Sequence, residues 1–379
     1  MRFSERLIKC RYMTVLLLFS GTNVLPLLGK QTIRPMRISA TSAFVLIILS
    51  SVTFFGCEGE KKQNRTRSVK GEVSLGGTLH VASRQLPPSL DPIHLRTNAA
   101  VEVGVHFLEG LVRLDPTSSK IIPGVARSWS VDESKSAYVF SLNEDVRFHS
   151  FPCNANSSRE LTAKDVVYSF ERLTKEADSL MFRSTLGGKL KGADEFRDGK
   201  TETIAGLVVI DDYSIKIELE QPDESFLFIL AQPSLGIVSK EMGLNCKGHQ
   251  LVGSGPFQLA SDQPLLLTRF EDYHRKDEFG NQFPYLDTLT FVVLPSNSEQ
   301  LEAFFDGTID AVFRLEIDPV RMILEQHISE FSGQRPKYIM KREAETASYE
   351  TYSIHKAEVK GLSDGFMGYR DFTQVQIEQ

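Results

Sequence analysis

The stretch TAKDVVYSFERL at residues 162–173 decides the fold of the region around it. Thr162 can cap a helix N-terminus, and the side chain of Asp165 can bond back to the backbone of the capping residue. A carboxylate at that position also favours the positive end of the helix dipole. Helical spacing then puts one set of apolar residues on a single face and one set of charged residues opposite: Val166, Phe170 and Leu173 with Val167 beside them, against Glu171, Arg172 and Lys175. The stretch therefore predicts a capped amphipathic helix on a globular core, and a capping box alone carries no chemistry.

Short patterns flank this helix in a fixed order. P-x-x-A-x-S-W occupies residues 123–129, Y-x-F-x-L occupies 138–142, and V-x-F-H occupies 146–149. Together with L-T-A-K-D-V-x-Y-S-F at 161–170, this series resembles the extracytoplasmic solute-binding proteins of ABC importers, specifically family 5, the peptide- and nickel-binding proteins. The resemblance implies an α/β fold of two lobes, the type II periplasmic-binding-protein architecture, which closes on its solute by hinge motion.

Further family-like patterns lie toward both ends of the chain. G-G-T-L at 76–79 opens the body, G-x-G-P-F at 253–257 predicts a tight turn before a strand, and P-Y-L-D stands at 284–287. His274 stands where the family usually has tryptophan, and we expect a surface or structural histidine there rather than a catalytic one. The resemblance points to the segment after the first strand and to the turn before residue 257 as the ligand cleft, with these candidates: Arg84, Gln85, Leu86 and Gly255.

The order of predicted elements suggests an interrupted two-lobed chain. We expect a first lobe with a mixed sheet over 76–287, part of a second lobe over 288–352, and a return segment over 353–379 that resembles the family's own C-terminus. Family members carry a long second lobe before this return, so an internal deletion is the simplest account. Periodicity adds further elements: strands at 76–82, 206–210, 214–219 and 236–239, and helices at 98–111 and 319–331, the last with Val320, Ile323, Leu324, Ile328 and Phe331 on one side.

The first 57 residues have the features of a targeting signal. An apolar run over 43–49 and a second one that ends at Gly56-Cys57 fit a signal peptide with a lipobox-like cysteine, so we expect Cys57 to be lipidated. A plain membrane anchor or an uncleaved signal remains the alternative. Met36 begins a signal of normal proportions, which suggests that translation starts there. Residues 58–75 are polar at first and predict a flexible tether.

Charge and cysteine content argue against nucleic-acid binding and against a metal or cofactor site. Residues 1–56 carry seven basic residues and one acidic residue, so the remainder holds 36 basic and 48 acidic residues, a net charge of −12. An acidic body argues against nucleic acid as a partner. Cys153 and Cys246 lie in polar surroundings, where they form either a disulfide in an oxidising compartment or two free thiols. Neither a metal-ligand cluster nor a cofactor motif is present, so we expect no metal and no cofactor.

Two functions remain open. The first is a lipid-anchored receptor in the cell envelope that captures peptides and delivers them to an ABC permease on the extracytoplasmic or periplasmic side. The second is a shortened or degenerate paralogue with a structural or partner-binding role and no transport activity. An enzyme is not expected, because the sequence lacks G-x-S-x-G, H-E-x-x-H and P-loop patterns. If much of the second lobe is missing, we expect peptides to bind weakly or not at all.

Overall fold

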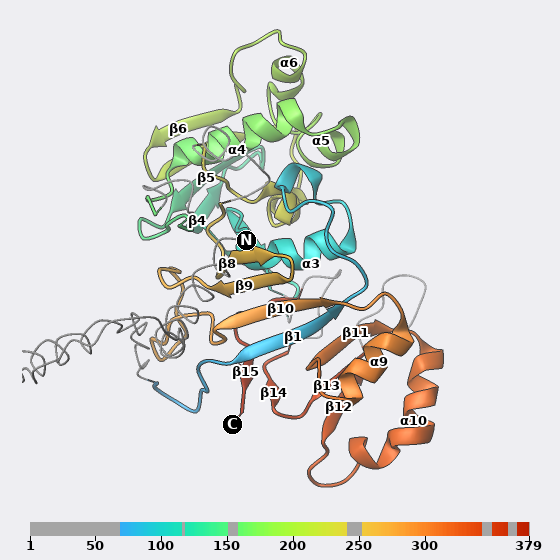
Figure 1. The fold of residues 1–379 in the computed structure, drawn as a ribbon. Coiled ribbons are helices and arrows are strands. Elements are labelled where there is room, and N and C mark those ends of the chain that lie inside the picture. Colours follow the sequence, from blue (N-terminus) through green and yellow to red (C-terminus); the bar gives the residue numbers. More distant parts are fainter. Residues whose placement is uncertain are drawn as a thin grey trace, which may run out of the picture. The chain divides into compact units, whose positions relative to one another are not determined.

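A computed structural model describes residues 69–115, 118–150, 158–240, 252–342, 351–362 and 370–378. These residues fold as a mixed α/β body with a seven-stranded sheet, a four-stranded sheet and two short strand pairs (Figure 1). In this part of the chain, no helix has the length and apolar character needed to cross a membrane. The α/β class predicted from the sequence is confirmed.

The seven-stranded sheet has the order β12-β13-β11-β1-β10-β9-β8. Its strands are β1 Thr78–Ser83, β8 Phe257–Asp262, β9 Leu265–Arg269, β10 Thr288–Val293, β11 Ala311–Leu315, β12 Tyr338–Arg342 and β13 Tyr352–Lys356. β1 runs parallel to both of its neighbours, with Ser83 opposite Val293 of β10 and Val81 opposite Ala311 of β11. All other pairs are antiparallel. The carboxyl ends of three adjacent strands therefore meet at one edge of the sheet.

The helix α3 (Asn98–Phe107) packs on this sheet next to β8. Thr97 caps it, because its hydroxyl oxygen accepts a hydrogen bond from the Ala100 N–H at 3.1 Å. The predicted helix over 98–111 is too long: Leu108 already has an extended backbone. Gly110 follows so close to the Leu230 carbonyl that a Cβ atom would lie 2.8 Å from that oxygen. The close approach requires glycine and ends the helix early.

The four-stranded sheet is antiparallel, in the order β4-β5-β7-β6. Its strands are β4 Ala126–Val131, β5 Ala137–Leu142, β6 Leu207–Asp211 and β7 Ser214–Glu218, so the predicted hairpin over 206–219 is confirmed. The helix α4 (Ala163–Glu176) covers it and buries Val166, Phe170 and Leu173 as predicted. On the face opposite the apolar residues, the Arg172 guanidinium pairs with both carboxylate oxygens of Asp91, at 2.8 and 2.6 Å.

The helices α9 (Asn297–Phe305) and α10 (Ile317–Phe331) lie beside β11 and β12 (Figure 1). Val320 and Ile323 of α10 are buried as predicted, but Ile328 is 58% exposed. The reason is a kink: His327 has non-helical backbone angles, so the last turn of the helix points its side chains in new directions.

Short elements complete the described chain. They are β2 Val112–Leu114, β3 Ile121–Pro123, β14 Val359–Lys360, β15 Gln376–Ile377, α5 Ser179–Thr185, α6 Ala193–Arg197, α7 Phe226–Leu230 and two 3₁₀ turns, η2 Pro92–His94 and η3 Pro233–Leu235. The predicted strand over 236–239 is wrong, because these residues are buried but pair with no strand among the described residues. Their burial explains the apolar sequence without a sheet.

The predicted lobe and tether boundaries remain predictions, but two facts bear on them. Strands from 76–287, from 288–352 and from the return segment all join the seven-stranded sheet. At the end of the predicted tether, the Ser74 hydroxyl donates to the Ile377 carbonyl at 2.9 Å, and Val73 and Leu75 pack against buried aromatic residues. The ordered body therefore begins a few residues before the first strand.

Candidate functional site

A cavity of about 960 Å³ opens at the carboxyl ends of β1 and β11. Its lining comes from five places: the end of β1 and the residues after it, the first half of α3, the middle of α9, the end of β11 with the start of α10, and Thr351 just before β13. In open α/β sheets, ligands bind outside the carboxyl ends of the strands, where neighbouring connections diverge. The chain from β10 passes through α9 and crosses β1 to reach β11, so β1 lies at such a divergence.

Hydrogen bonds hold the wall that follows β1. The Ser83 hydroxyl donates to the Gln85 carbonyl at 2.8 Å, and the Ser83 carbonyl accepts from the Leu294 N–H at 2.8 Å. The buried Gln300 amide of α9 donates to the Leu294 carbonyl at 2.8 Å. Arg84 reaches across to α9, where its guanidinium donates to Asn297 Oδ1 at 2.6 Å. The end of β1 is thus a fixed surface with polar side chains on it.

Glu102, Phe313 and Arg314 form the inner wall of the cavity, and the Glu102 carboxylate is shared by two arginines. Glu102 Oε1 of α3 accepts from Arg370 at 2.9 Å and lies 3.3 Å from the Arg314 guanidinium. Arg314 has a positive φ of 58° and sits where the register of β11 shifts between Val312 and Leu315. Such a bulge re-aims a side chain at the end of a strand, and a non-glycine residue there is an uncommon, strained conformation.

The mouth of the cavity is polar and exposed. Glu316, Ile317 and Asp318, at the start of α10, are exposed, as are Arg84 and Gln85 across the cavity. Asp318 lies 3.7 Å from Arg321 in the next turn. The cavity therefore presents both signs of charge around a partly apolar floor, which suits a polar solute with separated charges. Across the described ranges, no group of three or more His, Cys, Asp or Glu residues is placed to hold a metal ion.

The predicted ligand residues divide between two places. Arg84 and Gln85 line the cavity, whereas Leu86 follows them and is not part of the lining. Gly255 lies elsewhere, against the end of α3, where a Cβ atom would come within 2.7 Å of the Phe107 carbonyl carbon. Its own carbonyl contacts His149 Nε2 at 2.8 Å. Their roles in binding remain predictions. Cys57, Cys153 and Cys246 lie outside the described residues.

Sequence reasoning missed Glu102, Arg314 and Arg370. Arg314 had a usable signal, because a charged residue interrupts an otherwise apolar strand. Arg370 belongs to the ending that resembles the family, but nothing in the sequence places it beside residues of α3 and β11.

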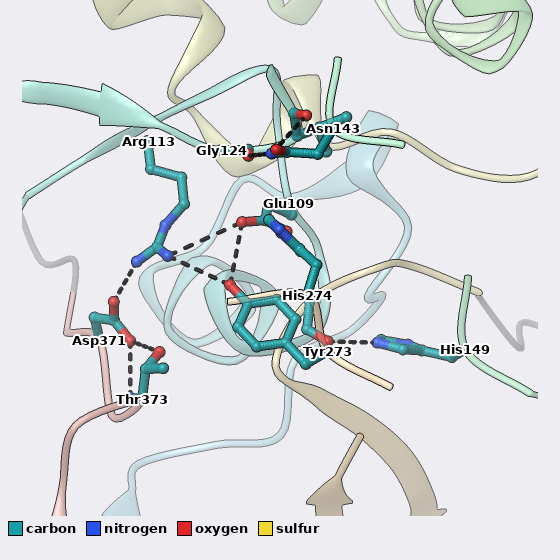
Figure 2. A network of polar contacts seen from close by, with 11 residues as sticks. Glu109, Arg113, Gly124, Asn143, His149, Tyr273, His274, Asp371 and Thr373 are labelled. Carbon is teal, nitrogen blue, oxygen red and sulfur yellow. Dashed lines mark hydrogen bonds and ion pairs between the residues drawn. The ribbon is translucent and has the colours of Figure 1, made fainter. Parts of the chain in front are cut away.

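A second polar network, seen in Figure 2, is centred on the buried Glu109. Its carboxylate accepts from the Tyr273 hydroxyl at 3.1 Å and contacts His274 Nε2 at 3.0 Å. His274 is thus a buried structural partner. Nearby, Arg113 forms an ion pair with Asp371. Burial opposes ionisation of Asp371, but the Arg113 guanidinium holds the pKa of Asp371 below its usual value. Burial also raises the pKa of the Tyr273 hydroxyl well above its ordinary value. The network ties the C-terminal segment to the core.

The sequence also matches a known family. The model for "Bacterial extracellular solute-binding proteins, family 5 Middle" matches residues 120–352. The chain belongs to this family. Curated family 5 relatives include the dipeptide-binding protein of Escherichia coli, 28% identical over 58% of this chain and 42% of its own length. The di/tripeptide-binding protein 2 of Pseudomonas aeruginosa is 31% identical over 48% of this chain and 35% of its own length.

Solved structures agree on the fold of this family 5 chain. The periplasmic binding protein DppA of Helicobacter pylori in complex with the peptide STSA is 26% identical, with a TM-score of 0.55, over 71% of this chain and 51% of that one. The murein tripeptide binding protein MppA of Escherichia coli has a TM-score of 0.58 at 21% identity, over 72% and 51%. The chain thus spans about half the length of these proteins and shares their two-lobed periplasmic-binding-protein fold class.

Proposed function

We propose that this chain captures peptides for an ABC importer and that the cavity beside β1 forms its side of the peptide site. One observation carries the proposal: the residues after the first strand, Arg84 and Gln85, line a cavity at the carboxyl ends of parallel strands. The relatives named for dipeptide and di/tripeptide binding support peptides as the solute class. An extended peptide offers charged ends and backbone amides, which the mixed charges of the lining can meet. Binding without chemistry is the role proposed, rather than catalysis.

The proposal extends to the location of the protein. Cys57 carries the lipid, residues after it form the tether, and the body works on the extracytoplasmic or periplasmic side beside a membrane permease. The family places such proteins outside the cytoplasm, which supports this part of the proposal. The apolar run that ends at Gly56-Cys57 supports the lipid anchor.

Filling the cavity tests the peptide site. Ala99 lines it from the start of α3 and is half-buried, so Ala99→Trp should occupy the space. Ala137 is also half-buried but lies at the start of β5, outside the lining, and Ala137→Trp is the matched control. The full chain in mild detergent is titrated with a pool of tri- to pentapeptides, and binding is monitored by NMR. The wild type and Ala137→Trp should bind peptides, and Ala99→Trp should not.

The outcomes test the location of the peptide site and the function of the chain separately. Equal binding by both tryptophan variants would move the site away from this cavity. No binding by the wild type at millimolar peptide would favour the alternative, a shortened paralogue with a structural or partner-binding role and no transport activity.

A further inference from the structure

The C-terminal segment that begins at Arg370 reaches the cavity wall. Arg370 is 5% exposed, and its guanidinium donates to Glu102 Oε1 at 2.9 Å. The same guanidinium lies 4.2 Å from the centre of the Phe313 ring, which also lines the cavity. One arginine from the end of the chain thus contacts a residue of α3 and a residue of β11 together.

The neighbouring residues anchor this segment separately. Phe372 stacks on His106 of α3 with ring centres 4.7 Å apart, and Asp371 pairs with Arg113 of β2. The Thr373 N–H donates to Asp371 Oδ1 at 2.8 Å. Phe372 also stacks on Phe313 of the cavity lining, with ring centres 5.9 Å apart. Arg370 is therefore not the only anchor of the end of the chain.

Arg370 adds a positive charge beside the inner wall. Glu102 is shared by Arg314 and Arg370. With Arg370 removed, that positive charge is lost, and Glu102 keeps only one of the two guanidinium groups that contact it. A charge–charge interaction in a partly desolvated site is much stronger than in bulk water.

We propose that Arg370 is a positioning residue for the peptide site: it holds Glu102 and Phe313 in the inner wall and adds a positive charge beside it. This inference rests on the proposed function for the choice of solute. Its consequence is a preference among peptides, because a positive charge beside the wall disfavours a cationic side chain relative to an acidic one. A residue that only stabilises the fold would weaken all peptides alike.

Two readouts test the proposal on the full chain. Hydrogen exchange of residues 311–317 reports whether the end of β11 stays ordered, without any ligand. NMR titration with the tripeptides Ala-Lys-Ala and Ala-Glu-Ala reports the charge preference. In Arg370→Met, we expect exchange at 311–317 to be at least about fivefold faster. The ratio of affinities should move about tenfold toward Ala-Lys-Ala.

Two further variants give the test its controls. Arg370→Lys keeps the charge, so it should restore most of the peptide ratio. Asp371→Asn weakens the separate anchor at Arg113 and should lower stability while it leaves the ratio unchanged. An unchanged exchange rate in Arg370→Met, or a ratio that moves equally in Asp371→Asn, would overturn the proposal. If the wild type binds neither tripeptide, the proposed function fails, and the exchange rates alone decide whether Arg370 orders this wall.

Discussion

His106 lies on α3 and faces the C-terminal segment in the core, stacked on Phe372. Burial lowers its pKa to about 4, and the nearby Asp371 offsets this only in part. Its buried Nδ1 has no hydrogen-bond partner among the residues that the structure describes. The neutral imidazole is therefore favoured in the folded protein, while the unfolded chain takes up a proton near pH 6.5.

This arrangement predicts an acid-sensitive core. Because the folded pKa lies below the unfolded one, the stabilisation is present above about pH 6.5 and is lost as the pH falls toward 4. Between pH 7.5 and 5, His106 alone should cost about 2 kcal/mol of unfolding free energy. His106→Phe should remove about that part of the pH dependence. Denaturant unfolding at both pH values measures it.

An exposed histidine provides the control for that measurement. His94 is exposed in η2, so His94→Gln should leave the pH dependence as in the wild type. His149, whose pKa burial also lowers to about 4, should keep some acid sensitivity in the His106 variant. If His106→Phe loses as much stability at pH 5 as the wild type, the histidine is not neutral in the fold.

Cys57 stands at the end of an apolar run near the start of the sequence. We expect it to be the lipidated residue, because the apolar run before it ends at Gly56-Cys57 and a polar stretch follows. Cells fed a fatty-acid probe should label the wild type but not Cys57→Ala. Cys153→Ala, in the body of the chain, is the matched control and should be labelled normally. Equal labelling of both variants would exclude Cys57 as the attachment site.

Single side chains were hard to place from sequence where the partner is distant in the chain. His274 could be recognised as a structural candidate, but its partner Glu109 could not be named. The position of Arg172 opposite the apolar stripe could be predicted, but its partner Asp91, from another segment, could not. Local periodicity reports which way a side chain points and does not report what arrives there.

The helix α4 begins at a capping box formed by Thr162 and Asp165. The Thr162 N–H donates to Asp165 Oδ2 at 2.9 Å and its hydroxyl donates to the same oxygen at 3.1 Å. Arg159 pairs with the same buried carboxylate. Thr162→Ala should lower the unfolding free energy by roughly 1 kcal/mol, the usual cost of a lost cap. Thr203→Ala, at an exposed bend, serves as the control in the same thermal melts. A melt of Thr162→Ala that overlays the control would mean that the cap contributes nothing.

Elements with strong local signals were predictable, and those that depend on close contacts were not. The capping pattern and apolar stripe of α4 and the turn-linked runs of β6 and β7 were enough to predict them. The end of α3 depends on how near Gly110 passes to Leu230, and the change of face in α10 depends on a kink at His327. Neither is encoded in hydrophobic periodicity.

At the scale of the whole molecule, strand order was the main unknown. Periodicity predicts a first strand at 76–82 but does not place β1 between β10 and β11. That order creates the cavity, since it brings three carboxyl ends to one edge. It also gathers Glu102, Arg314 and Arg370 from three distant segments. The family resemblance pointed to Arg84 and Gln85, which line the cavity, and the residues of the inner wall required the structure.

The exposed mouth of the cavity limits how tightly a peptide can bind. A ligand pocket that binds tightly encloses most of its ligand. Here Arg84, Gln85, Glu316 and Asp318 all face solvent at the mouth, so a bound peptide would keep part of its backbone in water. A well-placed charged partner contributes on the order of 2 kcal/mol, or about thirtyfold in affinity, and exposure to water weakens each such contact.

We therefore expect the full chain to bind a pool of tri- to pentapeptides with a Kd weaker than micromolar. Calorimetric titration in mild detergent measures it, and Ala99→Trp, which fills the cavity, sets the background. Raising the salt concentration should weaken the binding further, because the exposed charges at the mouth are screened by ions. A micromolar or tighter Kd that Ala99→Trp abolishes would show that this cavity, open as it is, already makes a complete peptide site.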